Sequence, residues 1–581
     1  MSQPPATNAP STAKLTRIAV DIGGTFTDVA LDWEGGCTTV KCLTTTQAPE
    51  EGVLSGITTT LDHAGIDPGD VDLLVHGTTL ATNAIIERQG AVSALITTAG
   101  FRDIVETGYE NRYDQYDIYL DKRAPLIPRR RRFGVPERIS ANGDVLVSLD
   151  ENDILKLIPT LEQQQVSSVA VGFLHSYVNP IHEHRVRSVL DEHLPDVHVT
   201  LSCEVCPEIR EYERLSTACA NAYVQPLMSR YLRRLLQRLH EQRIEAAVFL
   251  MSSGGGLMTL DTGAKFPIRL VESGPAGGAV LAGKIAAECA ESQVVSFDMG
   301  GTTAKICLID GFTPDTVQGF EVDRAARFLK GSGLPVRVPV IEMIEIGAGG
   351  GSVARVDELG QIAVGPRSAG ADPGPACYGV GGEEATVTDA DLVLGRIDAD
   401  RFADGTIALE PRAANRALER CIAKPLSVST IIAGCGISEV VDERMANAAR
   451  VHAIERGRNI GAHTMIAFGG AAPLHAARLA QKLGIARIIV PTHAGVGSTI
   501  GFLRAPVAYE VIHSHYMRLK SFDYESANRV LCALSKDARD TVSTGAPDQT
   551  LQERRSAHMR YAGQGHEIVV SLPLRALTEA D

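Results

Sequence analysis

This sequence of 581 residues contains no long hydrophobic run. No stretch reaches the roughly 18 to 20 apolar residues that a membrane-spanning helix needs, so we expect no membrane partner. Residues 1–14 are rich in Pro, Ser, Thr and Ala and have no apolar core. This composition favours a disordered tail over a signal peptide.

Positive charge is also scarce. The chain has 56 Lys and Arg against 70 Asp and Glu, which gives a net charge of −14. Because an acidic surface repels phosphate backbones and anionic headgroups, nucleic acid and anionic membranes are poor partners. The run Arg129–Arg132 is the exception. One short basic run in an acidic chain is typical of a solvated or interface face.

Paired cysteine motifs and metal-ligand spacings are lacking. The eleven cysteines are irregularly spaced, which is typical of reduced thiols and predicts a cytoplasmic location. Cys203 and Cys206 form one C-x-x-C pair with no second pair, so structural cysteines are favoured over zinc. The sixteen histidines are scattered, without an H-x-x-E-H spacing. We therefore expect no hydrolytic metal site on this chain.

What is present is an ordinary globular composition, with 44% hydrophobic and 22% charged residues. The length suits about three or four domains. Strand-like and helix-like patterns alternate along most of the chain, which predicts an α/β fold with mixed sheets.

The most informative stretch is 17–32, where two apolar runs flank a Gly-Gly turn. This pattern predicts a β-hairpin. Glycines let backbone N–H groups approach an anion, and threonine hydroxyls add donors. We therefore expect a phosphate cradle, made by Gly23, Gly24, Thr25 and Thr27. Asp21 ends the first strand, where a carboxylate can hold Mg²⁺ or orient water beside a phosphate. The alternative is an ordinary glycine-rich hairpin.

The stretch 294–310 repeats this device in order and chemistry. Two such hairpins in one chain argue against an ordinary glycine-rich hairpin in both places. We therefore predict a second phosphate cradle, in which Asp298 has the role of Asp21. The cradle residues are Gly300, Gly301, Thr302 and Thr303. Lys305 follows on the returning strand, where its side chain points either to a phosphate or elsewhere. The two stretches resemble the two phosphate loops of the actin, Hsp70 and sugar-kinase superfamily, in which two lobes close on ATP.

A third glycine turn lies in 464–476, between a strand and the start of a helix. It resembles the adenosine motif of the same superfamily. The resemblance implies that Gly469 and Gly470 leave room for the base and ribose of ATP.

A dense polar cluster lies in 76–88, where we predict a helix start. It contains His76, Thr78, Thr79 and Asn83. A helix N-terminus favours anions and oxyanions, so the cluster suits a phosphoryl group or a substrate carbonyl oxygen. The alternative is a helix cap, with His76 hydrogen-bonded to a carbonyl.

Two further glycine-rich loops lie at 347–352 and 365–379. The first lacks the small residue and the ribose-binding acid of a dinucleotide fingerprint, so we reject a Rossmann site. The second has the proline and glycine density of an ordered loop or a linker.

In combination and order, these motifs resemble one family closely, the ATP-dependent hydantoinase A/5-oxoprolinase family. The resemblance covers residues 16–575. The family includes the ATP-binding subunits of N-methylhydantoinase and caprolactamase, and the corresponding subunits of acetone and acetophenone carboxylases. The matching motifs are Asp21-Ile-Gly-Gly-Thr-Phe-Thr-Asp28, His76-Gly-Thr-Thr-Leu-Ala-Thr-Asn83, Pro136-Glu-Arg138, Glu272-Ser-Gly-Pro-Ala-Gly277, Asp298-Met-Gly-Gly-Thr-Thr303, Gly347-Ala-Gly-Gly-Gly-Ser352, Asp372-Pro-Gly-Pro-Ala-Cys-Tyr-Gly379 and Phe468-Gly-Gly-Ala471.

The resemblance implies a two-lobed ATPase fold of the actin, Hsp70 and sugar-kinase type, plus a smaller C-terminal α+β domain. We place the tail at 1–14, the first lobe with insertions at 15–270, the second lobe at 271–505 and the C-terminal domain at 506–581. Family members usually continue about a hundred residues beyond a segment like 563–567, so the resemblance leaves two alternatives for this last domain: it is truncated, or it is completed by other residues.

The resemblance also implies the chemistry. ATP, with Mg²⁺ held by Asp21 and Asp298, phosphorylates the carbonyl oxygen of a lactam or hydantoin, and water then opens the ring. A partner B-type subunit carries the hydrolytic metal site. The alternatives are the ATP-binding subunit of a ketone carboxylase, a small-molecule kinase and a non-enzymatic ATP switch. The long loops 347–352 and 365–379 argue against a non-enzymatic ATP switch.

Overall fold

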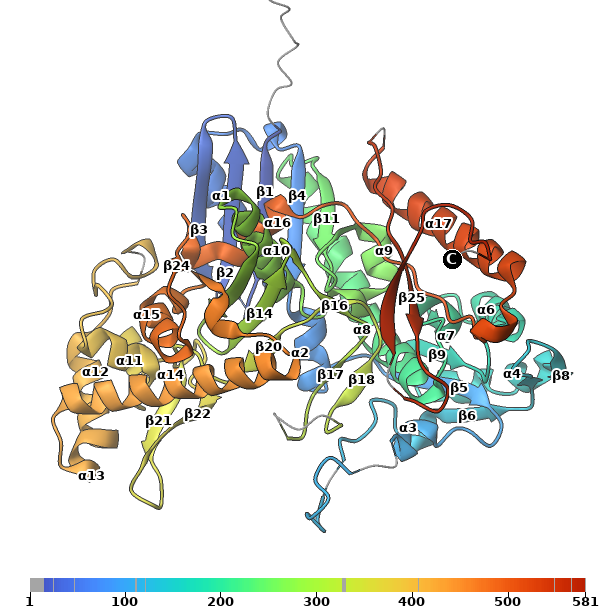
Figure 1. The fold of residues 1–581 in the computed structure, drawn as a ribbon, viewed down its shortest axis with the longest axis horizontal. Coiled ribbons are helices and arrows are strands. Elements are labelled where there is room, and N and C mark those ends of the chain that lie inside the picture. The colour runs from blue at the N-terminus through green and yellow to red at the C-terminus, as the bar shows by residue number, and fades with distance from the viewer. Residues whose placement is uncertain are drawn as a thin grey trace, which may run out of the picture.

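The fold is that of a computed structural model (Figure 1). It describes residues 15–24, 26–45, 48–109, 112–120, 122–326, 331–405, 407–547, 549–565, 567–579 and 581. The tail predicted at 1–14 and the phosphate-cradle candidate Thr25 lie outside the described residues.

The first lobe is built on a six-stranded mixed sheet in the order β12-β11-β4-β1-β2-β3. Its central hairpin is the one predicted at 17–32, and Asp21 lies directly opposite Asp28 in the register. Strand β4 adds in parallel to β1, and α1 packs on β2 and β3. The elements are β1 (Arg17–Ile22), β2 (Phe26–Trp33), β3 (Gly36–Leu43), α1 (Pro49–Ala64), β4 (Leu73–Thr78), α2 (Leu80–Ile86), β11 (Ala247–Met251), β12 (Leu257–Thr259) and α9 (Leu260–Lys265).

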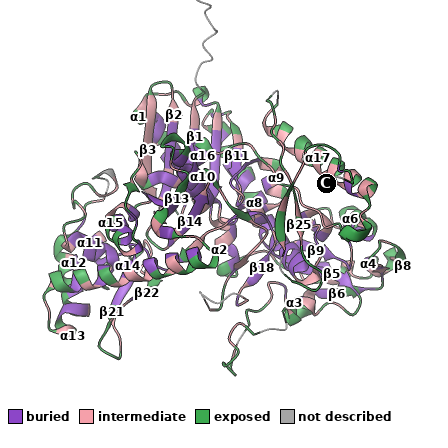
Figure 2. Cartoon of the chain, viewed as in Figure 1, coloured by how far each residue is buried: buried purple, intermediate pink, exposed green. Residues whose placement is uncertain are grey.

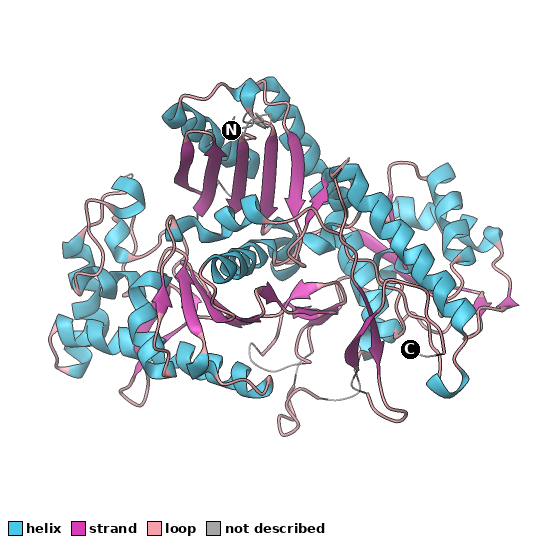
Figure 3. Ribbon diagram, turned by 45° about the horizontal axis from the view of Figure 1, so that its top comes forward, coloured by secondary structure: helices cyan, strands magenta, loops and turns pink. Residues whose placement is uncertain are grey.

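The second lobe repeats this arrangement. An antiparallel hairpin, β13-β14, places Asp298 opposite Lys305, and β23 and β24 add to it in parallel. The two hairpin sheets, separated by helices in Figure 3, confirm the predicted two-lobed mixed α/β fold. The elements of this sheet are β13 (Gln293–Met299), β14 (Ala304–Asp310), β15 (Thr313–Pro314), β20 (Ile344–Ile346), β23 (Thr464–Phe468) and β24 (Ile488–Ile489).

Helices and short strands complete the second lobe. Ser429 caps the N-terminus of α14 (Thr430–Glu455), because its hydroxyl accepts a hydrogen bond from the N–H of Ile432. The elements are β16 (Thr316–Val317), β17 (Phe320–Val322), β18 (Leu334–Val336), β19 (Val340–Ile341), β21 (Ser352–Val356), β22 (Ile362–Ser368), α11 (Val387–Val393), α12 (Pro411–Leu418), α13 (Lys424–Leu426), α14 (Thr430–Glu455) and α15 (Ala472–Leu483).

An inserted α/β unit lies between β4 and β11 of the first lobe. Its sheet, β10-β9-β5-β6, is entirely parallel, and the long helix α8 packs on it. The arginine run at 129–132 is not all solvated, since Arg132 is 2% exposed and binds Glu106. The elements are β5 (Ser93–Thr98), α3 (Ile104–Thr107), β6 (Arg132–Val135), β7 (Arg138–Ile139), β8 (Val145–Val147), α4 (Glu151–Leu155), α5 (Ile158–Gln163), β9 (Ser168–Gly172), α6 (Ile181–His193), β10 (His198–Leu201), α7 (Ser202–Val205) and α8 (Glu211–Glu241).

Two helices, α10 (Ser273–Glu288) and α16 (Gly497–Arg504), lie between the two hairpin sheets. Their apolar side chains share one core cluster with residues of both sheets, buried in Figure 2. The helices cross at two glycines, since a β-carbon at Gly501 would lie 1.9 Å from the carbonyl oxygen of Gly277. Any side chain at position 501 would therefore force the two helices apart.

The C-terminal segment is a small α+β unit, as predicted. It contains α17 (Tyr524–Gly545) and the hairpin of β25 (Arg555–Met559) and β26 (Ile568–Leu572). Directly after Pro506, Val507 makes an isolated parallel bridge to Leu257. In the part of the chain that the structure describes, no single helix is long and apolar enough to cross a bilayer. The pair Pro411–Leu426 and Thr430–Glu455, bent by 89°, meets that threshold only in combination.

Candidate functional site

The two hairpin aspartates approach the same helix from opposite lobes. A β-carbon at Gly274 of α10 would lie 3.0 Å from Asp21 Oδ2, and one at Gly278 would lie 3.4 Å from Asp298 Oδ2. Residues four apart lie on one face of a helix. The motif at 272–278 therefore brings α10 close to both carboxylates. A β-carbon at Gly274 would crowd the Asp21 carboxylate, whereas one at Gly278 would clash with the Phe468 ring, 2.6 Å away.

Burial dominates the electrostatics of Asp21. Burial raises its pKa to about 7, helped by the negative charges of Asp28 and Asp298 and opposed by Lys305 and Lys41. Its Oδ1 atom is buried and has no hydrogen-bond partner among the described residues. A buried carboxylate oxygen without a partner is costly unless a cation or a proton reaches it. This is the environment that a metal-binding carboxylate requires.

Asp298 is where the second hairpin meets the third glycine turn. Burial raises its pKa to about 6, although Lys305 and a hydrogen bond from Ser498 Oγ at 3.2 Å lower it. A β-carbon at Gly469 would lie only 2.4 Å from Asp298 Oδ1. The N–H of Ala471 also donates to the carbonyl of Met299 at 2.9 Å. The structure thus joins two of the three predicted motifs at one carboxylate.

Two lysines balance these carboxylates. Lys41 Nζ lies 2.5 Å from Asp28 Oδ1, and Lys305 Nζ lies 2.8 Å from Glu272 Oε2. Side chains directly opposite in an antiparallel pair share one face of the sheet. Asp28 therefore faces the same side as Asp21, and Lys305 the same side as Asp298.

The three glycine turns leave open space above their backbones. A β-carbon at Gly24, Gly300 or Gly470 would meet no atom within 4 Å. Each of the three turns thus has one such position, where a ligand can approach the main chain closely. This space and the orphaned Asp21 oxygen fit a nucleotide phosphate chain with its divalent cation.

The loop 347–352 packs against the glycine turn of the second hairpin. The N–H groups of Gly350 and Gly351 donate to the carbonyls of Gly300 and Gly301 at 3.0 and 2.7 Å. A β-carbon at Gly349 would lie 2.6 Å from the Gly301 carbonyl oxygen. The loop rejected as a dinucleotide fingerprint therefore holds the predicted phosphate turn in place.

The predicted cradle threonines occupy different environments. Thr27 is buried and its hydroxyl lies 3.1 Å from that of Thr44, which donates to the Gly23 carbonyl. Thr27 therefore braces the first turn from inside. Thr302 is exposed and Thr303 is half-buried at the tip of the second hairpin, where their hydroxyls are accessible.

The helix predicted to start at His76 begins at Leu80 instead. Strand β4 runs on to Thr78, because residues 73–78 pair in parallel with 17–22 of β1. The cluster ties this strand end to its neighbours. The N–H of Thr78 donates to Ser273 Oγ at 3.3 Å, and Thr79 Oγ1 donates to the Ile22 carbonyl at 3.2 Å. The Asn83 amide donates to Thr79 Oγ1 at 3.5 Å.

His76 itself lies in the core beneath α8. Its Nδ1 is 3.3 Å from the Val20 carbonyl and its Nε2 is 2.9 Å from the Tyr231 hydroxyl. Because a carbonyl only accepts, Nδ1 carries the proton and Tyr231 donates to Nε2. Burial lowers the His76 pKa to about 4, so the ring is neutral at pH 7. The neighbouring Gly77 faces Asp21, and His76 faces the opposite side of the sheet.

Sequence reasoning missed four side chains of this site. Asp28 and Glu272 lie inside quoted motifs, so their position beside a glycine turn was the available signal. Lys41 lies opposite Asp28 on the neighbouring strand β3, Ser498 lies on the distant helix α16, and neither is part of a quoted motif. Within the described residues, no group of three or more His, Cys, Asp or Glu side chains is arranged to hold a metal ion.

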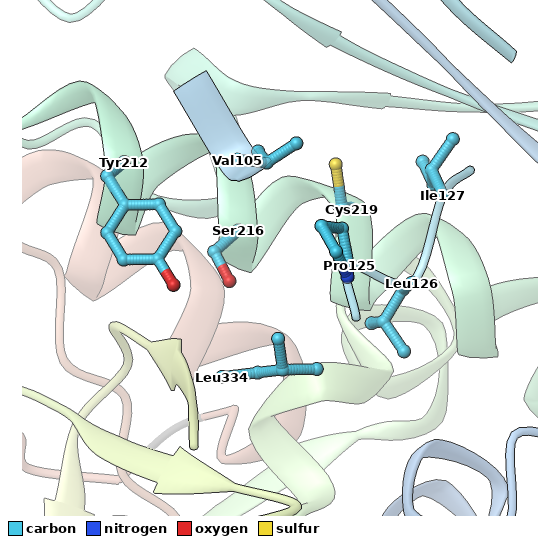
Figure 4. Close-up of a pocket in the computed structure, with 8 residues that line it drawn as sticks. All are labelled: Val105, Pro125, Leu126, Ile127, Tyr212, Ser216, Cys219 and Leu334. Atoms are coloured by element: carbon cyan, nitrogen blue, oxygen red, sulfur yellow. The ribbon is translucent and has the colours of Figure 1, made fainter. Parts of the chain in front are cut away.

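A small apolar pocket lies elsewhere, between α3, α8 and β18 (Figure 4). Its volume is about 10 Å³, which accommodates roughly one water molecule. Its polar groups are the Tyr212 and Ser216 hydroxyls. The lining residues are Val105, Pro125, Leu126, Ile127, Tyr212, Ser216, Cys219 and Leu334. It is too small for an organic substrate and contains none of the predicted site residues.

Comparison with known proteins places these features in context. The sequence profile described as Hydantoinase/oxoprolinase matches residues 214–511, and its N-terminal region profile matches residues 17–194. The chain is 35% identical to caprolactamase subunit alpha of Pseudomonas jessenii, covering 96% of this chain and 80% of that protein. It is 31% identical to the acetophenone carboxylase gamma subunit of Aromatoleum aromaticum, covering 98% and 79%. The crystal structure of the ATP-dependent caprolactamase from Pseudomonas jessenii superposes with a TM-score of 0.82, 34% identity and coverage of 97% and 82%.

Proposed function

Because this chain belongs to the hydantoinase/oxoprolinase family, we propose that it is the ATP-binding, substrate-phosphorylating subunit of a cyclic amide hydrolase. The observation that carries this proposal is the meeting of Asp21 and Asp298, one from each lobe, against two glycines of α10. Two glycine-threonine turns with an aspartate behind each suit the two ends of a triphosphate.

The proposed reaction activates an unreactive amide carbonyl. The carbonyl oxygen attacks the γ-phosphorus, a C–O–P bond forms, and the bond from the γ-phosphorus to the bridging oxygen breaks to release ADP. The amide N–H proton leaves, which gives an imidate phosphate. Water then adds to its carbon and the ring C–N bond breaks, which gives a free amine and an acyl phosphate. A second water molecule hydrolyses the acyl phosphate to the carboxylate and inorganic phosphate.

The chain's own residues supply positioning and charge balance in this scheme. The open backbone at Gly24 and Gly300 would accept phosphate oxygens, and Gly470 would leave room for the nucleoside. Asp21 and Asp298 would hold Mg²⁺, which neutralises phosphate charge when bound. Thr302 and Thr303 would donate hydroxyls from the exposed hairpin tip.

We propose further that the chain works with a B-type partner subunit that completes ring opening. Its relatives carry the names of subunits, alpha in one case and gamma in another. A permanent complex would bury more than about 2,000 Å² in total. The isolated chain would then bind ATP and open no ring.

The second candidate is the ATP-binding subunit of a ketone carboxylase. The 31% identity to an acetophenone carboxylase subunit favours it. The same site would then phosphorylate an enolate oxygen, and bicarbonate would supply the carboxyl group. A small-molecule kinase would differ from both because its phosphorylated product accumulates.

The deciding experiment is ADP release by the chain co-purified with the adjacent partner, on a panel of lactams, hydantoins and ketones with and without bicarbonate. The proposal expects ADP release and ring opening with a cyclic amide, independent of bicarbonate. Bicarbonate-dependent turnover of a ketone would replace it with the carboxylase. No binding of Mg-ATP by calorimetry would overturn both.

A further inference from the structure

The ion pair between Lys305 and Glu272 joins two elements at the centre of the proposed ATP site. Lys305 is the second residue of β14, and Glu272 directly precedes α10. The side chains are 17% and 23% exposed, so water reaches both only in part. The pair is therefore neither a surface ion pair nor sealed in the core.

Glu272 is held in an unusual conformation. Its φ is +64°, in the left-handed region that non-glycine residues rarely adopt. It occupies the N-cap position of α10, yet its side chain makes no capping hydrogen bond. The carboxylate reaches across to Lys305 instead. Strained backbone of this kind persists where the surroundings fix a functional side chain.

The residues after Glu272 hold it close to both lobes. The Ser273 hydroxyl donates to the Thr78 carbonyl at 3.4 Å, and Gly274 contacts Asp21. On the other side, Lys305 lies opposite Asp298 in the hairpin. Lys305 lowers the pKa of both aspartates, so its charge acts on both carboxylates of the site.

The charge balance leaves Lys305 as the cation that can change partner. Lys41 is held by Asp28 of the adjacent strand and lies over the Phe26 ring. Lys305 is held by the Glu272 carboxylate from a different element, and Glu345 lies opposite it on the neighbouring strand β20. A triphosphate entering beside Asp21, Asp298 and Glu272 meets like charge, and a lysine paired with the terminal phosphate offsets it.

We infer that Lys305 binds the terminal phosphate of ATP and that Glu272 is its counter-ion in the nucleotide-free chain, exchanged for phosphate when ATP enters. This rests on the proposed function, since it names a phosphate ligand of that same site. The exchange keeps the half-buried lysine paired in both states. It also makes the pair sensitive to the γ-phosphate, which ADP lacks.

The test measures Mg-ATP and Mg-ADP dissociation constants by calorimetry on the purified full chain. Lys305→Met should weaken Mg-ATP about tenfold or more and Mg-ADP much less, because a charged hydrogen bond to the γ-phosphate is lost. Glu272→Gln keeps the shape of the side chain but frees the lysine, so it should tighten Mg-ATP by about threefold to tenfold. In the double variant the gain from Glu272→Gln should vanish, because the two residues act through one contact.

The matched control is Lys284→Met, which removes an exposed positive charge from the same helix α10 and should leave both constants unchanged. Weaker Mg-ATP binding by Glu272→Gln would overturn the inference and make the pair a structural tie. So would equal losses of Mg-ATP and Mg-ADP in Lys305→Met. A gain of affinity in Glu272→Gln cannot arise from a damaged fold, so this variant decides even where Lys305→Met is unstable. A wild-type chain that binds no Mg-ATP would overturn the proposed function itself.

Discussion

The Nδ1 atom of His475 lies 2.8 Å from Asp442 Oδ1, deep inside the second lobe. Its Nε2 lies 3.1 Å from Asp391 Oδ2, and all three side chains are at most 1% exposed. Arg396 completes the group through a 2.9 Å bond to Asp391. The imidazolium therefore ties α15, which follows the third glycine turn, to α11 and α14.

This group predicts a loss of stability at alkaline pH. Burial lowers the His475 pKa, but hydrogen bonds to Asp391 and Asp442 outweigh it and raise the value to about 9 from 6.5. A raised histidine pKa contributes stability that is fully present below pH 6.5 and is lost as the pH rises through 9. The loss should reach about 3 kcal/mol, measured as unfolding free energy between pH 6.5 and 9.5.

The control for this prediction is His475→Gln, which cannot carry the charge. It should be less stable than the wild type at pH 6.5, because two buried carboxylates lose their cation. Its stability should then change less between pH 6.5 and 9.5. Parallel pH profiles for the two proteins would assign the alkaline loss to other groups.

Asp21→Asn and Asp298→Asn should separate stability from activity. Each should lower turnover about a hundredfold or more, the scale of losing a positioned charged group. In the nucleotide-free chain each should keep or raise the melting temperature, because burial disfavours the ionised carboxylate at both positions. Steady-state ADP release and thermal unfolding at pH 8 give the two readouts. Near-normal turnover of both folded variants would remove these residues from the proposed mechanism.

His76→Ala should act on stability. It leaves the buried Tyr231 hydroxyl without its partner, at about 1–3 kcal/mol for an unsatisfied buried group. Tyr231→Phe should cost less, and the double variant should cost less than the sum, because the two side chains share one hydrogen bond. Urea unfolding of the three variants measures this coupling. A fall in kcat of His76→Ala at unchanged stability would return His76 to the site that we proposed for it from the sequence.

The two glycine-turn hairpins were predicted from the sequence because a local pattern of residues encodes them. Two apolar runs around a glycine turn sufficed to place both hairpins, with Asp21 and Asp298 at the ends of their first strands. The start of α2 was misplaced because β4 continues to Thr78 only through its pairing with β1. That pairing is a long-range contact that the residues 76–79 do not encode themselves.

The site's charge balance was beyond prediction for the same reason. Lys41 reaches Asp28 from the neighbouring strand β3, and Ser498 reaches Asp298 from helix α16, 200 residues further along the chain. Thr27 looked like a phosphate donor in the motif, but the alternation of β2 turns it inward toward Thr44. Sequence patterns therefore gave the backbone of the site more fully than its side-chain partners.

Gly274→Ala tests whether the approach of α10 positions Asp21. Alanine favours a helix over glycine by about 1 kcal/mol, so the variant should fold and melt at or above the wild-type temperature. Its β-carbon would lie 3.0 Å from Asp21 Oδ2 and 3.3 Å from Oδ1, which requires the carboxylate to move. A displaced catalytic carboxylate should lower turnover about tenfold to a hundredfold.

The matched control for this variant is Gly434→Ala in α14. Its β-carbon would meet Leu394 and Leu418 at ordinary distances of 3.4 to 3.6 Å, remote from both aspartates. It should gain the same helix stability and keep full turnover. Equal kinetics of the two alanine variants would show that Asp21 tolerates a larger neighbour, and the close contact at Gly274 would then be a matter of packing between the lobes. Loss of turnover in Gly274→Ala alone, with both proteins equally stable, would tie the glycine of the 272–278 motif to the chemistry of Asp21.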